Sequence, residues 1–428
     1  MNPQGSHDLI PGGAHTYAKG DDQYPVTAPA FIIRGQGCHV WDPDGNEYIE
    51  YGMGLRAVTL GHAYPSVVKR VRATLDLGAN FTRPSPLEAE AAERILSLVR
   101  PGQMVKFCKN GSDATTAATR LARAVTGRDL IASCRDQPFF STDDWFIGAS
   151  AMNAGIPKVV QDLTVGFDYG DIAHLERLFA EYAGEIACVV MEAARESEPP
   201  PGYLQAVGEL CRRHGAVWIL DEMITGFRWH NGGAQARYGL EPDLSAFGKG
   251  LGNGFAISAL VGRADLMRRG GLDTAEERVF LLSTTHGAEL AGLAAALGTI
   301  DTYLEQPVIE HLHRQGRRLA DGVRRVTESH GVSAFLDTSG RASNLVYRTR
   351  DTEGKPSQPF RTLFMQELIR HGVLGPSFVV SYSHEDADID RTIEATDAAA
   401  KVYAQALEDG PERFLTGRPV KPAIRRYA

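Results

Sequence analysis

The chain has 428 residues, 43% hydrophobic and 23% charged, with a formal net charge of −8. This composition is ordinary for a globular protein, and the length favours two or three subdomains. Lysine and arginine are dispersed in short clusters such as Arg212-Arg213, which argues against binding to nucleic acid. The most apolar stretches, such as 288–300, contain glycine or polar residues and fall short of a membrane span. We therefore expect neither a nucleic acid nor a membrane as partner.

The cysteines and the start of the chain indicate the compartment. Five cysteines without a C-x-x-C pair argue against a disulfide framework and a zinc knuckle. The first residues lack the charged and apolar regions of a signal peptide. His384-Glu-Asp386 lacks metal-ligand spacing and is assigned to capping or surface roles. We expect a cytoplasmic protein with no metal site.

The first hundred residues contain a hairpin and a helix. Strand-like residues flank Asp42-Pro-Asp-Gly-Asn46, whose glycine is the fourth residue of the acidic turn rather than the sixth, so a β-turn is favoured over a calcium loop. Further along, Ser85 as N-cap, Pro86 at N1 and Glu88 at N3 predict a helix over 85–100.

Beyond residue 100, apolar strand-like runs alternate with helical stretches. The predicted strands are 105–108, 129–134, 186–192, 216–220 and 256–262, and the predicted helices are 112–126, 203–214 and 288–304. Buried strands separated by helices indicate a mostly parallel α/β sheet. From about residue 306, long amphipathic helices and short strands indicate a smaller α+β domain.

Two segments in this region suggest chemistry. The strand 216–220 ends in Asp221, and ligand crevices of open α/β sheets lie beyond such strand ends. Lys249 follows in a loop with glycines at 248, 250, 252 and 254. A dinucleotide fingerprint would need these glycines to open a helix, but they lead into a strand-like run. Alone, Lys249 could equally be a solvated loop residue.

A third segment changes this interpretation. The strand 105–108 runs into Asn110, Gly111 and Ser112, which open a helix. Free N–H groups at a helix start, a glycine and a hydroxyl form a phosphate cup. A lysine amine, a strand-end carboxylate and an anion cradle are the three groups that pyridoxal 5′-phosphate (PLP) requires.

Several motifs in the right order carry a resemblance to a known family. They are Pro11-Gly-Gly13, the WDPDGNEYIEY segment, Leu60-Gly-His62, Asn110-Gly-Ser-Asp-Ala114, Asp221-Glu-Met-Ile-Thr-Gly-Phe-Arg228 and Gly248-Lys249. From about Ile10 onward the chain resembles the class III aminotransferases of PLP fold type I, in the branch of glutamate-1-semialdehyde 2,1-aminomutase. The resemblance implies an α/β fold, whose large domain has a mostly parallel seven-stranded sheet flanked by helices. A smaller α+β domain is built from both termini. We expect an N-terminal segment over 1–60, the PLP-binding domain over 61–305 and a C-terminal domain over 306–428.

The resemblance also assigns roles to the catalytic and ring-binding residues. Lys249 would form the Schiff base and serve as the proton-transfer base, and Asp221 would pair with the pyridinium nitrogen. Met223, at the family's valine position, would pack on the ring. Phe139 would stack on it where the family has a Tyr-His pair. Glu192 would fix the site near the ring hydroxyl, or would make an ordinary strand-end ion pair.

The phosphate contacts carry over in the same way. Asn110, Gly111 and Ser112 would hold the phosphate. Thr284, in Ser-Thr-Thr-His-Gly287, matches the family's threonine that reaches the phosphate of the other subunit. The resemblance therefore implies a homodimer.

The substrate side departs from the family pattern. The aminomutase grips a substrate carboxylate with an arginine, and Lys19 stands at that position here. Lysine is a point charge and does not supply bidentate capture. Arg56 replaces part of the family's Ser-Trp-Gly-Pro stretch. Together with His15 and Tyr17, Lys19 and Arg56 would form a polar mouth for a hydroxylated substrate such as a sugar or aminocyclitol.

The sequence thus predicts a PLP-dependent aminotransferase that moves an amino group from a small-molecule donor to a keto or aldehyde acceptor. Two alternatives stay open on the same cofactor: an aminomutase of the glutamate-1-semialdehyde type, and an epimerase. A third, of another class, is a non-catalytic PLP-fold binding module, although the intact lysine, aspartate and phosphate cup weigh against it.

Overall fold

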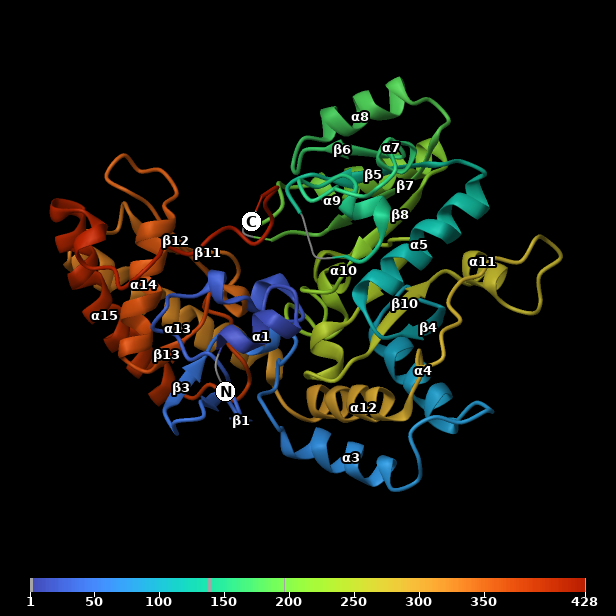
Figure 1. Ribbon diagram of the computed structural model, residues 1–428. Coiled ribbons are helices and arrows are strands. Elements are labelled where there is room, and N and C mark those ends of the chain that lie inside the picture. The colour runs from blue at the N-terminus through green and yellow to red at the C-terminus, as the bar shows by residue number, and fades with distance from the viewer. Residues whose placement is uncertain (1–2, 138–140, 196, 428) are drawn as a thin grey trace. The chain divides into compact units, whose positions relative to one another are not determined.

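The computed structural model describes residues 3–137, 141–195 and 197–427. The chain divides into two compact units. The terminal unit comprises Met1–Tyr64 and Glu310–Arg425, and the central unit comprises Pro65–Ile309 and Arg426–Ala428. In Figure 1 the terminal unit is drawn mainly in dark blue, orange and red.

A seven-stranded sheet organises the central unit, in the order β4-β10-β9-β8-β7-β5-β6. Its strands are β4 (Met104–Cys108), β5 (Leu130–Cys134), β6 (Thr164–Phe167), β7 (Ile186–Glu192), β8 (Val217–Asp221), β9 (Leu244–Phe247) and β10 (Ser258–Gly262). Strand β10 runs antiparallel to β4 and β9, and the other neighbours are parallel. The predicted mostly parallel seven-stranded sheet is confirmed.

Helices cover both faces of this sheet. Those of the central unit are α3 (Pro65–Leu75), α4 (Pro86–Leu98), α5 (Gly111–Thr126), α6 (Asp144–Ile147), α7 (Lys158–Gln161), α8 (Ile172–Glu181), α9 (Tyr203–His214), α10 (Gly233–Tyr238), α11 (Ala264–Met267) and α12 (Leu290–Glu305), with the 3₁₀ turns η3 (Lys249–Gly252) and η4 (Arg268–Gly270). Helix α5 packs across β7–β10 and β4, and α9 packs on the opposite face against β8 (Figure 1).

Side-chain alternation along β8 builds one core on each face. Val217 and Ile219 face α5, whereas Trp218 and Leu220 belong to the cluster under α8 and α9. Helix α5 presents alanines to the sheet, and these small side chains let the helix lie close to it. By the same alternation Asp221, at the end of β8, is on the α5 side.

Local signals account for the element ends. Helix α4 starts with the predicted capping box: Ser85 Oγ accepts from Leu87 N, and Glu88 Oε1 accepts from Ser85 N. The Asp42 carboxylate accepts N–H bonds from Asp44 and Asn46 at 3.0 and 2.9 Å, which closes a turn between two strands. The acidic segment is therefore a β-turn, as expected.

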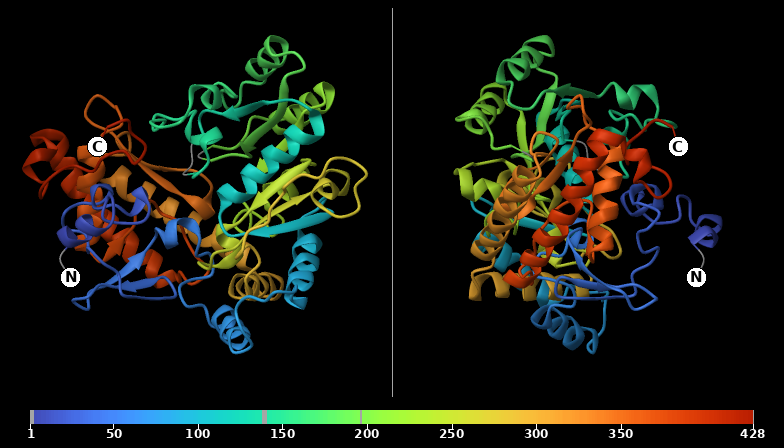
Figure 2. Two further views of the ribbon diagram at one scale, coloured as in Figure 1. Left: turned by 45° about the vertical axis from the view of Figure 1, so that its right-hand side comes forward. Right: turned by 90° about the vertical axis from the view of Figure 1, so that its left-hand side faces the viewer.

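The terminal unit is an α+β structure made from both ends of the chain. Its four-stranded sheet has the order β1-β2-β3-β13, in which β13 from the C-terminal part pairs parallel with β3. Helices α14 and α15 lie side by side (Figure 2). The elements are α1 (Pro3–Leu9), η1 (Tyr17–Lys19), η2 (Asp21–Gln23), β1 (Arg34–Gln36), β2 (His39–Trp41), β3 (Glu47–Glu50), α2 (Met53–Arg56), α13 (Val308–Ser329), β11 (Leu336–Ser339), η5 (Ala342–Asn344), β12 (Val346–Thr349), α14 (Gln358–Arg370), β13 (Val373–Leu374), α15 (Asp386–Asp409) and η6 (Pro411–Arg413).

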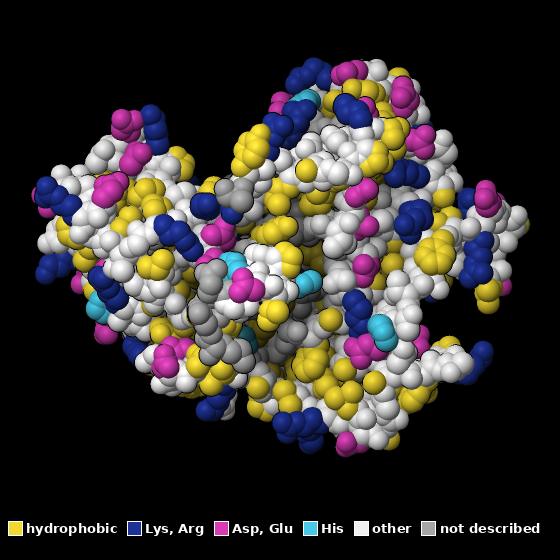
Figure 3. All heavy atoms as spheres, in the orientation of Figure 1, with side chains coloured by type: hydrophobic (Ala, Val, Ile, Leu, Met, Phe, Trp, Pro, Cys, Tyr) yellow, Lys and Arg dark blue, Asp and Glu magenta, His cyan; other side chains and the backbone are white. Residues whose placement is uncertain are grey.

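The surface agrees with the charge pattern of the sequence. On the face drawn in Figure 3, lysine and arginine side chains are interspersed with aspartate and glutamate. Among the described residues, no helix is both long enough and apolar enough to cross a membrane.

The packing of α13 against η5 yields a stability prediction. A Cβ on Gly316 would overlap the backbone oxygen of Ala342. Gly316→Ala should therefore lower the free energy of unfolding by about 1–3 kcal/mol, measured by urea denaturation. Gly5→Ala is the matched control, because a Cβ at that helical glycine meets nothing within 4 Å. Equal effects of the two substitutions would contradict this packing.

Candidate cofactor-binding site

Two buried acids meet at the carboxyl ends of neighbouring strands. Glu192 ends β7, Asp221 ends β8, and the two residues are partners in the parallel register. Each is only 4% exposed. A cavity at this edge is lined by both acids and by Ser133, Cys134, Gln137, Phe146, Val190 and Met191. The structure thus places acids at the edge where open α/β sheets bind ligands.

Asp221 is held by its own motif. Its Oδ1 accepts the N–H of Met223 at 2.8 Å. Burial raises the pKa of Asp221, and the charges of Lys249 and Arg195 act against that rise. The carboxylate therefore depends on nearby cations to stay ionised.

The backbone of Glu192 and one of its carboxylate oxygens are hydrogen-bonded, whereas the other oxygen, called the open oxygen below, is not within the described part of the chain. The Gln137 amide clamps its backbone, accepting from Glu192 N at 2.8 Å and donating to Glu192 O at 3.0 Å. Arg195 Nε donates to its Oε1 at 2.8 Å, whereas Oε2 is buried without a hydrogen-bond partner among the described residues. Burial raises the pKa of Glu192 to about 7, although Arg195 opposes this. Such an oxygen can make a hydrogen bond to a ligand.

Lys249 stands on a strained turn directly after β9. Its φ is +45°, a left-handed conformation that is uncommon for a residue with a side chain. The preceding Gly248 is tightly enclosed, since a Cβ there would lie 2.5 Å from Ser258 Oγ and 2.7 Å from Met223 Sδ. The Lys249 charge lowers the pKa of both Asp221 and Glu192, so the lysine and the two acids form one electrostatic group. Backbone strain of this kind is typical of functional sites.

Met223 joins the three predicted segments. A Cβ on Gly111 would lie 2.8 Å from Met223 Sδ, the same atom that approaches Gly248. The start of α5, the segment after Asp221 and the lysine turn are therefore packed together through one thioether. A side chain at Gly111 or Gly248 would fit only if neighbouring side chains, Met223 above all, moved away.

The start of α5 presents backbone N–H groups at a braced helix end. Asn110 is its N-cap, and Asp113 Oδ2 accepts from Asn110 N at 2.9 Å and from Lys109 N at 3.3 Å. These two hydrogen bonds fix the segment before the helix. The first-turn N–H groups of Gly111 and Ser112 have no partner within the helix and are directed out of its start. Ser112 is buried there. Together with the helix dipole, these groups suit a phosphate.

Sequence reasoning missed the different role of the neighbouring acid Glu222. Its carboxylate accepts from Thr225 Oγ1 and from the backbone N–H groups of Ala234 and Gln235, the latter two at 2.8 Å. Burial raises its pKa to about 7, and these donors oppose the rise. Glu222 thus fixes the segment after the motif rather than a ligand. Gln137 and Arg195 were also missed, since neither belongs to a motif.

The remaining predicted residues lie elsewhere or outside the description. Thr284 is in the central unit, and its carbonyl accepts from Gly287 N at 3.3 Å. His15, Tyr17 and Lys19 are exposed around η1, and Arg56 Nε donates to Asn344 Oδ1 at 2.9 Å, all within the terminal unit. Phe139 lies outside the described residues.

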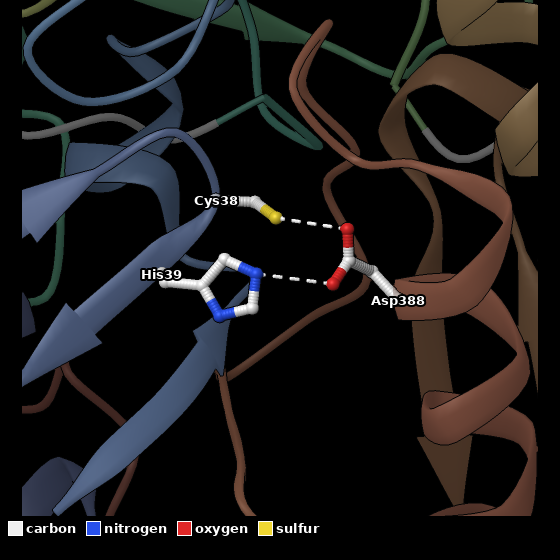
Figure 4. Close-up of side chains that lie close together, drawn as sticks. All are labelled: Cys38, His39 and Asp388. Carbon is white, nitrogen blue, oxygen red and sulfur yellow. Dashed lines mark hydrogen bonds and ion pairs between the residues drawn. The ribbon is translucent and has the colours of Figure 1, made fainter.

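A cluster of metal-ligating residue types lies in the terminal unit (Figure 4). Cys38 Sγ donates to Asp388 Oδ2 at 3.3 Å, and His39 Nε2 lies 3.1 Å from Asp388 Oδ1. Asp388 Oδ2 also accepts the N–H of Glu385, the N-cap of α15. These contacts brace the start of α15. His384, which was assigned to capping or the surface, is instead fully buried, and its Nδ1 accepts from Ser381 N.

The central residues fit PLP on their own chemistry. Asp221 and Glu192 line a cavity at the strand ends, the charge of Lys249 acts on the pKa of both acids, and the start of α5 offers first-turn N–H groups. These groups suit an aldehyde, a ring N–H and a phosphate in one ligand.

Comparison with known proteins agrees with this assignment. The family model "Aminotransferase class-III" matches residues 18–374. A glutamate-1-semialdehyde 2,1-aminomutase of Anaeromyxobacter sp. (strain Fw109-5) is 33% identical over 94% of this chain and 96% of its own length. The PLP internal aldimine form of the FumI protein of Sphingopyxis sp. MTA144 superposes with a TM-score of 0.87 at 27% identity, covering 98% of this chain and 97% of that one. An omega-transaminase of Sphaerobacter thermophilus superposes with a TM-score of 0.84 at 26% identity, over 94% and 96%.

The fold and the matches define a PLP-dependent enzyme of fold type I. More closely, the chain belongs to the class III aminotransferase family and resembles its glutamate-1-semialdehyde aminomutase branch. The enzyme acts on small molecules by amino-group transfer.

The open oxygen of Glu192 generates a pH prediction for the protein without PLP. Below about pH 4.5 the carboxyl is protonated in both the folded and the unfolded chain, whereas between about 4.5 and 7 only the folded chain retains the proton. The free energy of unfolding contributed by Glu192 therefore falls as pH rises through this window. The melting temperature of the wild type, compared with that of Glu192→Gln, should fall as the pH rises from about 4.5 to 7. Above about pH 7.5 the difference between the two proteins should stay constant. If the melting temperatures of the two proteins changed in parallel across this pH range, the burial of an unpaired carboxyl oxygen would be contradicted.

Proposed function

We propose that Lys249 is the lysine that binds PLP covalently and that Asp221 holds the ring nitrogen. The proposal is supported by one observation above all: a buried aspartate at a strand end shares its electrostatic environment with a lysine on a strained turn. When bound, PLP supplies an electron sink for the bond that breaks beside the amino group. The phosphate would lie at the start of α5, against Asn110, Gly111 and Ser112.

The chain's own groups would then divide the work. Asp221 would keep the ring nitrogen protonated, which strengthens the ring as an acceptor of electrons. Lys249 would hold PLP through its amine, and this amine would serve as the base that moves a proton at the substrate carbon. Glu192 would bind on the side of the ring hydroxyl through Oε2, and Gln137 and Arg195 hold Glu192 in place. Met223 would pack against one face of the ring.

We infer that the reaction is intermolecular transamination to a hydroxylated carbonyl acceptor, such as a sugar or aminocyclitol. Lys19 supports this choice, because the aminomutase pattern has an arginine there and a lysine does not form a two-pronged carboxylate clamp. His15 and Tyr17 beside it are hydrogen-bonding groups that suit hydroxyls. The 33% identical relatives are named aminomutases, so intramolecular transfer is the competing function.

The free, buried state of all five cysteines also supports a cytoplasmic, reducing compartment.

Dependence on an amino donor separates these functions. With a panel of keto- and aldehydo-sugars, we expect aminated product only when a donor such as glutamate is added, in a one-to-one ratio to the donor consumed. An aminomutase or epimerase would convert its substrate without any donor. Turnover of simple amino acids or amines with no turnover of sugars would contradict the hydroxylated acceptor. The absence of any half-reaction with donors would support a non-catalytic binding module.

We further propose a homodimer in which Thr284 donates to the PLP phosphate of the other subunit. Thr284→Ala should weaken PLP binding about 10-fold, the effect of losing one hydrogen bond to a charged group. Mixed dimers, in which one subunit carries Thr284→Ala and the other carries Lys249→Ala, decide which subunit's PLP is bound by Thr284. In the subunit with Thr284→Ala the lysine is intact, and the partner subunit supplies an intact Thr284. PLP binding at this site should therefore return to the wild-type affinity. Binding that stays weak in the mixed dimer would contradict contact across subunits.

A further inference from the structure

Lys109, directly before the phosphate cup, is tied to two other segments of the central unit. Its Nζ donates to Glu289 Oε1 at 2.5 Å and to the carbonyl of Ala256 at 2.9 Å. The side chains of Lys109 and Glu289 are only 17% and 21% exposed. A pair this sheltered from solvent is worth more than a surface salt bridge, provided that its hydrogen bonds are satisfied.

Glu289 meets this condition because it also caps a helix. Its two oxygens accept the N–H groups of Ala291 and Gly292 at 2.9 and 2.8 Å at the start of α12. Although burial acts to raise the pKa of Glu289, the Lys109 ammonium and these N–H groups hold it below its usual value. The fit around the ammonium is tight, since a Cβ on Gly292 would lie 2.9 Å from Lys109 Nζ.

The three tied segments are those assigned to the cofactor. Lys109 precedes Asn110 and Gly111 of the phosphate cup, and Ala256 lies between the lysine turn and β10. Glu289 follows the stretch that contains Thr284. We propose that Lys109 is a positioning residue that fixes the phosphate end of the PLP site relative to these neighbours. Its ammonium is committed to Glu289 and Ala256, so it acts through the backbone of the cup rather than as a catalytic residue. The inference rests on the proposed function.

Comparing PLP with pyridoxal, which lacks the phosphate, tests this role. In Lys109→Met, equilibrium binding to the protein without cofactor should show a PLP dissociation constant raised about 10- to 100-fold. The constant for pyridoxal should change less than about 3-fold, since the aldehyde and ring contacts remain. Lys158→Met is the matched control, because it breaks an exposed ion pair with Asp162 in the same unit. It should leave both constants unchanged.

Glu289→Gln removes the negative charge that binds Lys109 but keeps a side chain that can cap the helix. It is the second test of the inference if Lys109→Met fails to fold. It should selectively weaken PLP binding by a smaller factor, and the double variant should be no weaker than Lys109→Met alone, because the two residues act as one unit. Unchanged PLP binding in Lys109→Met, or an equal loss for PLP and pyridoxal, would overturn the inference. If the wild type itself did not prefer PLP over pyridoxal, the phosphate cup of the proposed function would fail instead.

Discussion

Two carboxylates buried side by side at the ends of β7 and β8 impose the constraint on which the site depends. Asp221 and Glu192 lie in register, and removing two like charges from water at one place is costly unless cations balance them. Arg195 and Lys249 supply positive charge, yet one oxygen of Glu192 still lacks a donor. A cationic, hydrogen-bonding ring would complete this arrangement. The buried acids therefore suit this edge of the sheet to a ligand of that kind.

Close packing then sets the geometry around the acids. Met223 Sδ lies where a side chain at Gly111 or Gly248 would have to be, so the phosphate helix and the lysine turn are held against the segment that follows Asp221. Lys109 adds a second tie, from the residue before Asn110 to Ala256, beyond the lysine turn, and to Glu289 at the start of α12. These steric and ionic contacts pack the start of α5, the turn of Lys249 and the segment after Asp221 together before any ligand binds. Such preorganisation is what an efficient site requires.

Much of this could be predicted from the sequence, because the relevant signals are local. Apolar runs typical of strands buried on both faces predicted five of the seven strands of the sheet, and capping residues predicted the start of α4. The missed strands have weaker patterns: β6 is four residues long and only partly buried, and β9 contains a serine. Glu222 could not be separated from Asp221, since adjacent acids look alike until the fold turns one toward Ala234 and Gln235. Gln137, Arg195 and the Lys109–Glu289 pair depend on contacts between residues far apart in the chain. No local pattern encodes such contacts.

The central claim is that Lys249, beside Asp221, holds PLP. The most direct measurement is reduction of the PLP-loaded enzyme with borohydride, followed by peptide mass spectrometry to locate the cofactor. The account predicts that the pyridoxyl phosphate mass is found on the peptide containing Lys249, and that this adduct and the visible absorbance of lysine-bound PLP are lost in Lys249→Ala. An adduct on another lysine, such as Lys109, or an unchanged absorbance band in Lys249→Ala would contradict it.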